Sequence, residues 1–442
     1  MESKTCYIVN FNAKEYVLSC LDSVINSSKL PDGIEICVVD NASTDGSAQA
    51  VKDTYGARVR VIENEKNLGG AGGFNTALRD AIDNNIKYAI LLDNDIRVDK
   101  NCISNMISYL DEHADVGAVG AKIMIMDKPE FIQEFGGHLD MNNYYFKTDY
   151  WYEKDNENIE NIESEWLTSC AVAVRMEAAK KTNLFPEENF LFWDDIQFTW
   201  EIGKSGYKLI SLADAKVWHK GKKKALVNTS AAYYSMRNRT KFFAVCEKEE
   251  RLAFFCEKIL DEYFNVFFGS ALKGLDKMNS TRMFALDDFV HKNYGKIRDD
   301  VLWGFDGNAD KIHLLNLDNK KIFIKDDKNS SIEMQETINI LQNRLEQLQA
   351  VVVDNEKDSD MVFVPCSHIA DVKEDILPKI WFDKYLNIIA DEKDYGYVKA
   401  MPYMKELFVK MHYDWLMQGI VEERDIYKKK QLKVNSNKDS ML

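Results

Sequence analysis

The chain has 442 residues, of which 45% are hydrophobic and 29% are charged, and its formal net charge is -15. These proportions are typical of a globular protein large enough for two or more domains, and they exclude a disordered or fibrous chain. The acidic balance argues against a nucleic-acid partner, which requires a basic face. It leaves an anionic substrate open, because a bound metal ion reverses the local field.

The cysteines and the apolar runs bear on the compartment in which the protein works. Eight cysteines are scattered along the chain without a Cys-x-x-Cys pair, so we expect reduced thiols and a cytoplasmic location. The N-terminus lacks the apolar core of a signal peptide, and no run of about 18 uninterrupted apolar residues occurs. We therefore expect neither secretion nor a membrane span.

The first hundred residues alternate between strand and helix signals. Short β-prone runs are separated by segments with apolar residues at helical spacing, the clearest of which is 74–82. The strand signals lie at 5–9, 35–39, 59–62 and 88–92. Strands that alternate with helices in this way predict an α/β fold with a mostly parallel sheet and right-handed crossovers.

The remaining residues predict further strands and a second, mainly helical part. Strand signals continue at 116–126, 168–174, 207–210 and 215–218. Aromatic residues at helical spacing begin near residue 230, and later signals predict a small α/β unit. The change in composition divides the chain into an N-terminal domain over 1–229 and a C-terminal, mainly helical and α+β domain over 230–442.

Two carboxylates follow the strand signal at 88–92. Asp93 and Asp95 are separated by Asn94. In an open α/β sheet, ligands bind beyond the carboxyl ends of the strands, so this pair could present hard oxygen ligands to a divalent cation and a polyphosphate. A polar turn that caps the strand is the alternative.

Two earlier motifs also lie where a ligand could bind. Asp40 ends the second strand, where it could accept hydrogen bonds from a nucleobase or ribose, or close a turn. Asn67 begins a segment in which Gly69, Gly70, Gly72 and Gly73 precede a helix. Such glycines allow a ligand to approach the backbone near the positive helix end, and a flexible connection is the alternative. Their spacing matches neither a dinucleotide fingerprint nor a P-loop.

A second acidic pair stands behind aromatic residues. Trp193 precedes Asp194 and Asp195 at the expected start of a helix. Desolvation by aromatic neighbours would raise the pKa of a carboxyl group and make it a better proton acceptor. Capping of the helix by Asp194 is the alternative, and the two roles can coexist.

His219 stands at the end of an expected strand, ahead of a basic cluster. The lysines of this cluster are Lys220, Lys222, Lys223 and Lys224. A neutral imidazole suits a transition metal, and the lysines could contact a phosphate. A structural histidine and a solvated loop are the alternatives.

Taken in chain order, these motifs resemble those of the family 2 inverting glycosyltransferases with a GT-A fold. The glycine segment, Trp193-Asp194-Asp195 and the stretch 233–238 are most similar to the bacterial galactofuranosyl- and rhamnosyltransferase branch. The resemblance spans about residues 5–240. It implies a Rossmann-like, mostly parallel sheet with flanking helices, and it leaves the C-terminal 200 residues unassigned.

The resemblance also implies a role for each motif. Asp195 would be the general base, and Asp93, Asp95 and His219 would bind a divalent metal, Mn2+ or Mg2+. The residues implied in donor binding are Asp40, Asn67, Gly70, Asp93, Asn94 and Trp193. The metal would neutralise the leaving nucleoside diphosphate, and one base suffices for a single inverting displacement. Asn94 stands between the two aspartates, so only two strong metal ligands are offered there.

The function implied is metal-dependent, inverting transfer of galactofuranose or rhamnose from a UDP- or dTDP-sugar. The acceptor would be a glycan or a polyprenyl-diphosphate-linked glycan in bacterial surface polysaccharide synthesis. Aromatic residues over 250–268 could rest against the inner face of the cell membrane, although core packing is the more common use of such residues. A homo-oligomer is compatible with the sequence.

Two other functions are alternatives, of which the first uses the same sheet. A sugar-1-phosphate nucleotidyltransferase needs a glycine-rich loop with a basic residue after its first strand, and residues 9–14 contain no glycine. A non-catalytic glycan-assembly scaffold would use the helices of 330–442. The scaffold predicts that Asp195→Asn changes no activity, whereas the transferase predicts loss of transfer with donor binding retained.

Overall fold

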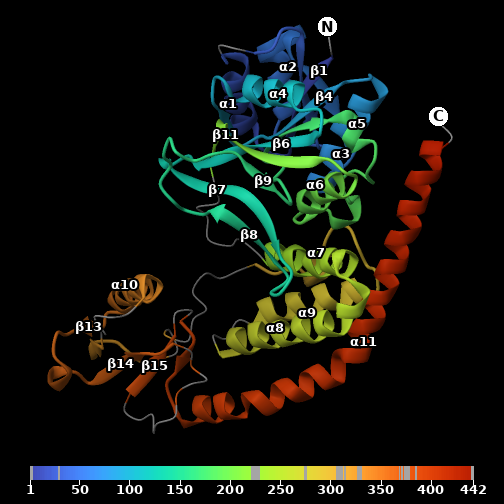
Figure 1. The fold of residues 1–442 in the computed structure, drawn as a ribbon. Coiled ribbons are helices and arrows are strands. Elements are labelled where there is room, and N and C mark those ends of the chain that lie inside the picture. Colours follow the sequence, from blue (N-terminus) through green and yellow to red (C-terminus); the bar gives the residue numbers. More distant parts are fainter. Residues whose placement is uncertain are drawn as a thin grey trace.

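One sheet of eleven strands organises the N-terminal half (Figure 1). Its core order is β3-β2-β1-β4-β10-β6-β11-β5, in which β1 to β4 are parallel and β10 runs antiparallel between β4 and β6. These strands are β1 (Lys4–Asn10), β2 (Ile34–Asp40), β3 (Arg60–Glu63), β4 (Tyr88–Asp93), β5 (Ile96–Val98), β6 (Val116–Ile125), β10 (Ala171–Arg175) and β11 (Lys208–His219). The predicted α/β sheet is confirmed, with antiparallel strands added beyond β4.

The computed structural model describes most of the chain. The described residues are 3–27, 30–220, 229–272, 276–304, 312, 315–325, 331–367, 369, 372, 379–383 and 386–439. Lys222, Lys223 and Lys224 of the basic cluster lie outside them. All eight cysteines are free thiols, as their scattered positions predict.

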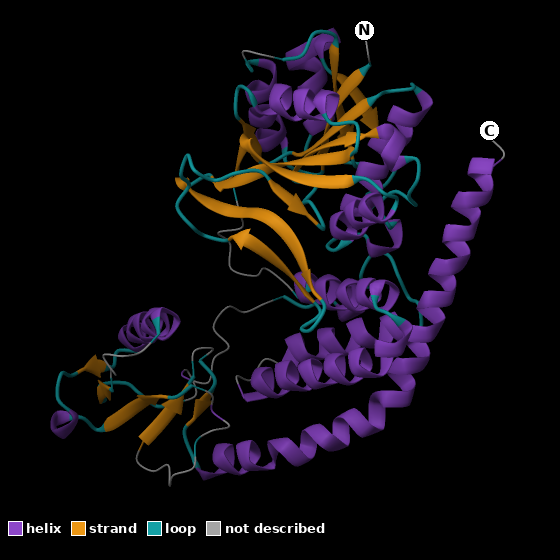
Figure 2. Ribbon diagram, viewed as in Figure 1, coloured by secondary structure: helices purple, strands orange, loops and turns teal. Residues whose placement is uncertain are grey.

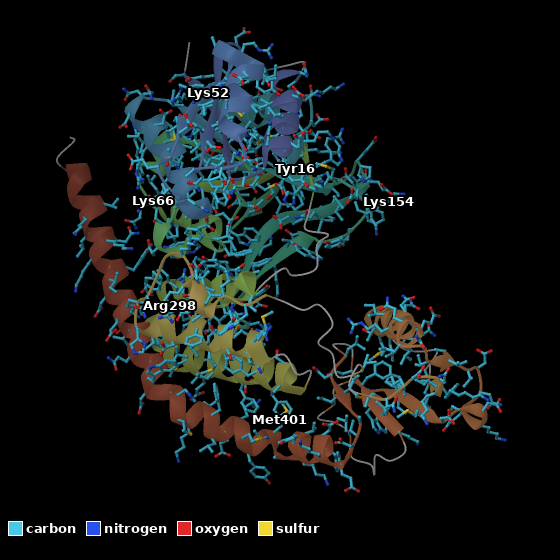
Figure 3. All side chains as sticks on the ribbon, turned by 180° about the vertical axis from the view of Figure 1, so that it is seen from behind. Tyr16, Lys52, Lys66, Lys154, Arg298 and Met401 are labelled. Atoms are coloured by element: carbon cyan, nitrogen blue, oxygen red, sulfur yellow. The ribbon has the colours of Figure 1, made fainter. Side chains whose placement is uncertain are left out.

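Helices cover both faces of this sheet, because alternate strand residues point to opposite sides. Cys6 and Ile8 of β1 join one core with α1, α2 and α4, whereas Tyr7 joins a second core with α3, α5 and α6. The helices are α1 (Lys14–Ile25), α2 (Ser47–Tyr55), α3 (Gly69–Asp83), α4 (Cys102–Glu112), α5 (Met176–Ala179) and α6 (Asp194–Lys204). Side chains fill both layers, as Figure 3 shows from behind.

A long hairpin extends from the sheet toward the helical layer (Figures 1 and 2). β7 (Lys128–Asp140) pairs with β6 and with β8 (Tyr145–Tyr150), and β9 (Ile162–Ser164) pairs with β11. Tyr144, at the hairpin turn, is buried and its ring meets those of Phe243 and Phe255 at 5.4 and 4.6 Å. The hairpin therefore joins the sheet to the helices below it.

The helical layer consists of α7 (Ser230–Cys246), α8 (Leu252–Leu272), α9 (Asp276–Val290) and the 48-residue α11 (Glu392–Asp439). Phe255, Ile259 and Tyr263 of α8 are buried against this layer, while Phe254 is exposed. Core packing is therefore the main use of the aromatic residues over 250–268. No helix within the described residues is both long and apolar enough to cross a membrane.

A second, five-stranded sheet lies in the C-terminal part, in the order β13-β12-β14-β15-β16. It comprises β12 (Lys321–Ile324), β13 (Val351–Val352), β14 (Met361–Pro365), β15 (Lys379–Phe382) and β16 (Ile388–Ile389), with α10 (Ile332–Gln347) packed on it. Ile322, Leu341 and Phe363 form its core. A small α/β unit was expected here from the strand signals, and the domain border at 229/230 stays a prediction.

Candidate active site

The carboxyl ends of β1, β2 and β4 meet at one edge of the sheet, because these strands are adjacent and parallel. Nδ2 of Asn94 donates to Oδ1 of Asn10 at 2.7 Å, and Nδ2 of Asn10 donates to Oδ2 of Asp40 at 3.1 Å. The backbone N–H of Ser43 donates to the other carboxylate oxygen of Asp40 at 2.8 Å. Asp40 and Asn94, predicted from separate motifs, thus belong to one network through Asn10, which the sequence analysis missed.

His219 reaches this edge because β11 pairs antiparallel with β5, which aligns His219 with Ile96. Its Nε2 lies 3.4 Å from Oδ1 of Asp95, and its Nδ1 lies 2.9 Å from the side-chain oxygen of Gln133. Burial lowers the pKa of His219, but the hydrogen bond and charge of Asp95 outweigh it, so the pKa is raised overall. The ring is thereby oriented by a partner on each nitrogen.

The side chains at this point fit a divalent cation. One ligand atom each of Asp93, Cys170 and His219 lies within 4.8 Å of the others, with Asp95 beside His219. Burial raises the pKa of the Cys170 thiol well above its ordinary value. The carboxylate and imidazole groups form a donor set that suits Mn2+. The carboxylate groups alone are suitable ligands for Mg2+.

Asp195 lies in the first turn of α6, with its carboxylate directed to the segment before β10. The backbone N–H of Ser169 donates to its Oδ2 at 3.3 Å. Burial raises the pKa of Asp195, which improves it as a proton acceptor, as the aromatic neighbours predict. Asp194 does not cap α6: the helix begins at Asp194, with Trp193 at the N-cap and no side-chain cap.

Glu134 on β7 is a site residue that the sequence analysis missed. Its pKa is raised to about 7, first by burial and then by the charges of Asp195 and Asp93, while His219 opposes the shift. Glu134 and the three residues whose charges act on it come from four different elements. Glu134 lies in a stretch where two register shifts interrupt the pairing of β6 with β7, so no regular alternation marked it in the sequence.

The backbone before Asp194 is strained. Phe190, Phe192 and Trp193 adopt φ angles of 64°, 67° and 63°, which cost free energy for residues other than glycine. The Trp193 side chain is only 4% exposed and packs among aromatic rings, so little of its surface faces a sugar. The surrounding structure must hold this conformation.

Two buried residues of α7 hold the strained segment. Nδ2 of Asn238 donates to the carbonyls of Leu191 and Phe192 at 2.8 and 3.0 Å. Nη2 of Arg237 donates to the carbonyls of Glu188 and Asn189 at 3.2 and 2.9 Å. Both side chains are fully buried, so α7 satisfies carbonyls that the strained turn leaves without helix or strand partners.

The glycine segment packs on the same turn. A Cβ at Gly69, whose φ is +74°, would lie 2.1 Å from the Phe190 carbonyl oxygen, whereas one at Gly70 would be 3.6 Å from Oδ2 of Asp194. The side chain of Asn67 accepts the N–H of Gly69 at 2.8 Å. These glycines form the first turn of α3, and close packing against the protein accounts for Gly69.

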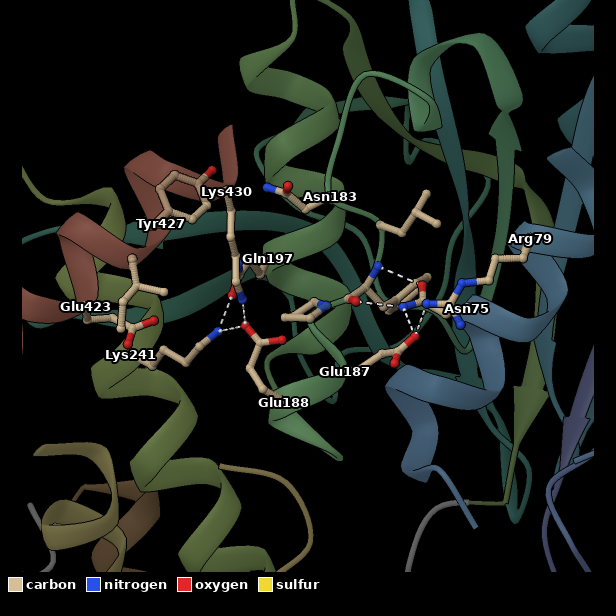
Figure 4. Close-up of a pocket in the computed structure, with 14 residues that line it drawn as sticks. Asn75, Arg79, Asn183, Glu187, Glu188, Gln197, Lys241, Glu423, Tyr427 and Lys430 are labelled. Carbon is tan, nitrogen blue, oxygen red and sulfur yellow. Dashed lines mark hydrogen bonds and ion pairs between the residues drawn. The ribbon is translucent and has the colours of Figure 1, made fainter. Parts of the chain in front are cut away.

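Figure 4 shows the preceding residues held from three helices. Nδ2 of Asn75 on α3 donates to the Phe185 carbonyl at 2.8 Å, and Oδ1 of Asn75 accepts the Phe185 N–H at 2.9 Å. Lys241 of α7 and Lys430 of α11 lie 3.2 and 2.6 Å from a carboxylate oxygen of Glu188, beside a cavity of about 240 Å³. Burial would raise the pKa of Glu188, but the two lysines outweigh it and hold the pKa at about 2.

Known proteins are similar to parts of this chain. An abequosyltransferase of Salmonella typhimurium is 32% identical over 25% of this chain and 33% of its own. A galactofuranosyltransferase of Mycolicibacterium smegmatis is 22% identical over 40% of this chain and 30% of its own. An N-acetylglucosaminyl-diphospho-decaprenol L-rhamnosyltransferase of Mycobacterium tuberculosis is 23% identical, over 42% and 66%. The chain thus spans about a third of the length of the first two relatives.

Among solved structures, GalNAc-T7 with UDP, GalNAc and Mn2+ is 15% identical, with a TM-score of 0.47, over 59% of this chain and 51% of that chain. Residues 5–180 match the family model described as glycosyl transferase family 2. The matched region contains the sheet edge with Asp40, Asp93 and Asp95, in agreement with the motifs. This N-terminal part of the chain is similar to glycosyl transferase family 2.

Proposed function

We propose that the protein is a metal-dependent, inverting glycosyltransferase that moves a sugar from a nucleoside-diphosphate donor to a hydroxyl group of a glycan acceptor. The observation that supports this is the approach of Asp93 and His219, whose ligand atoms lie within 4.8 Å of each other, with Asp95 beside His219. The charges of Asp93, His219 and Asp195 all act on Glu134, and the four residues come from four elements. The similarity of residues 5–180 to glycosyl transferase family 2 supports the same reaction class.

In the proposed reaction, Asp93, Asp95 and His219 would hold a divalent cation, which would neutralise negative charge on the diphosphate. Asp195 takes the proton of the acceptor hydroxyl as its oxygen bonds to the anomeric carbon. The bond from that carbon to the diphosphate breaks, and its electron pair leaves with the nucleoside diphosphate. Asp40, which accepts hydrogen bonds from Asn10 and Ser43, would contact the nucleoside together with Asn94.

The donor and acceptor are proposed at the level of chemical class. The leading donors are UDP-galactofuranose and dTDP-rhamnose, because a galactofuranosyltransferase and a rhamnosyltransferase are both similar to the chain. The name of the rhamnosyltransferase relative describes an acceptor linked through a diphosphate to a polyprenol. A lipid-linked glycan is therefore the acceptor class that we propose, with the protein in the cytoplasm or at the inner membrane face.

The test compares binding with transfer. We expect UDP or dTDP to bind the full chain more tightly with Mn2+ than with EDTA, as measured by calorimetry. Asp195→Asn should keep this binding and lose about 10²- to 10⁴-fold in sugar transfer, because a positioned base is removed. Asp53→Asn, on the exposed surface of α2, is the matched control and should leave both unchanged. Metal-independent binding of every nucleotide would contradict the proposal.

A further inference from the structure

A second cavity lies between the hairpin turn and the helical layer, away from the sheet edge. Its volume of about 850 Å³ is within the range of small-molecule sites. Residues from the β7–β8 turn, α7, α8 and α9 line it, among them Tyr145, Arg239, Lys258, Glu262 and Arg282. Neither the family match nor the predicted motifs assign it a role.

Arg239 gives this cavity a buried cation with unused donors. Its side chain belongs to a residue that is 5% exposed, and its Nη1 lies 2.7 Å from Oε1 of Glu262. Its Nε and Nη2 are buried and have no hydrogen-bond acceptor among the described residues. Because a buried donor without an acceptor is costly, such a guanidinium is suited to a ligand that brings oxygen atoms.

Arg282 adds a second guanidinium. Its Nη1 donates to the Ser270 hydroxyl, and it has no carboxylate partner within the part of the chain that the structure describes. Burial lowers its pKa to about 10, which is the expected effect of a cation that lacks a nearby counterion.

The charge around the cavity is positive in a chain whose net charge is -15. Arg239, Arg282 and Lys258 face two carboxylates, Asp261 and Glu262. Asp261 is paired with Lys405 of α11 at 2.6 Å, so its charge is compensated from outside the cavity. Three cations and two carboxylates line the cavity, and an anion would balance the set.

Aromatic contacts connect the cavity with the segment that carries the proposed base. The guanidinium carbon of Arg239 lies 5.4 Å from the centre of the Tyr145 ring, and that ring lies 6.0 Å from the ring of Trp193. Trp193 directly precedes Asp194 and Asp195. An acceptor that crosses Tyr145 could thus present one end to Asp195 and the other to Arg239.

We propose that this cavity binds a phosphate or diphosphate group of the acceptor substrate. The inference rests on the proposed function, because it assigns the charged end of the acceptor. Guanidinium groups hold phosphate oxygens in bidentate geometry, and the planar Tyr145 ring can support the sugar beside it. The group could belong to a polyprenyl diphosphate or to a soluble phosphate ester.

The experiment measures anion binding without metal. Full-length protein in EDTA is titrated with pyrophosphate and with farnesyl diphosphate by calorimetry. Binding at one equivalent is expected, weakened at least fivefold by Arg282→Gln and by Lys258→Gln. Arg298→Gln, an exposed arginine outside the cavity that is labelled in Figure 3, is the matched control and should bind as the wild type does.

The outcomes separate this inference from the proposed function. Absence of binding, or equal binding by all variants, would overturn it, even if UDP with Mn2+ still binds the wild type. Loss of UDP binding in the wild type would instead overturn the donor site. Tighter binding of farnesyl diphosphate than of pyrophosphate would indicate a lipid-linked acceptor, and equal binding a soluble phosphate ester.

Discussion

Two acidic regions within residues 187–195 differ in whether a cation lies beside the carboxyl group. One holds Asp194 and the proposed base Asp195, and the other holds Glu188. Burial raises the pKa of Asp194 and Asp195, which have no cation partner of their own among the interactions described above. Glu188, a few residues earlier, has its pKa held at about 2 because Lys241 and Lys430 outweigh its burial. The carboxyl groups without a cation partner are thus those at the proposed catalytic site. The carboxyl group with two lysine partners lies in the segment that supports that site.

This difference predicts opposite effects of mutation on stability. Removal of a compensated or hydrogen-bonded group should destabilise the fold, because its partners stay buried. Removal of an uncompensated carboxyl should stabilise the fold while it damages the proposed activity, as expected of a site that stores free energy for function.

The largest expected effect is that of Arg237→Leu. The substitution leaves the Gly295 carbonyl and Oδ1 of Asn238 without the donor that Arg237 provides. It also removes one of the donors to the carbonyls of Glu188 and Asn189, which keep others. At about 1–3 kcal/mol for each unsatisfied buried group, with partial relaxation, the free energy of unfolding should fall by about 3–5 kcal/mol. Urea unfolding measures it.

Arg298→Leu is the control for the same change of side chain on the surface, and it should cost less than about 0.5 kcal/mol. An equal loss of stability in both variants would show that Arg237 does not hold the strained segment.

The next effect is that of Glu188→Gln, and it depends on pH. A carboxyl whose pKa is lowered from 4.5 to about 2 stabilises the fold above the unfolded pKa, and this contribution is lost as the pH falls through 2. The variant should therefore lose about 2–3 kcal/mol of unfolding free energy at pH 7. The difference from the wild type should shrink between pH 5 and pH 2.

Glu187→Gln is the control, because Glu187 pairs with Arg79 in a more exposed position. Such a pair contributes less than about 1 kcal/mol. A constant difference between Glu188→Gln and the wild type from pH 7 to pH 2 would contradict the assignment of the stabilisation to the Glu188 charge.

The same contrast explains which parts of the molecule could be predicted from the sequence. Asp40 and Asp93 each end a strong apolar strand pattern, Asp95 follows Asp93 by two residues, and parallel strands bring their carboxyl ends together. The sheet and this edge therefore follow from local patterns. Asn10 is found only when the register of β1 against β2 and β4 is known.

The supporting contacts could not be predicted in this way. Arg237 and Asn238 are polar residues within a helix, and such residues are usually exposed. They are buried because the strained turn, 45 to 50 residues earlier, presents its carbonyls to α7. Capping of α6 by Asp194, the alternative that the sequence left open, does not occur, because the helix begins at Asp194 and Trp193, with a positive φ, is the N-cap residue.

The smallest expected effect, and the most direct test of the contrast, is that of Asp194→Asn. Burial, and then the charge of Asp195, raises the pKa of Asp194 well above its ordinary value, so ionisation of this carboxyl opposes folding. A raised pKa means that this carboxyl costs no stability at low pH, and that its cost grows as the pH rises from the unfolded pKa to the folded pKa. The neutral amide should therefore raise the unfolding temperature at pH 8 by a few degrees and leave it nearly unchanged at pH 4. Differential scanning calorimetry at the two pH values, with Asp53→Asn as the surface control, measures this change, and a lower unfolding temperature at pH 8 would mean that the buried Asp194 charge is compensated after all.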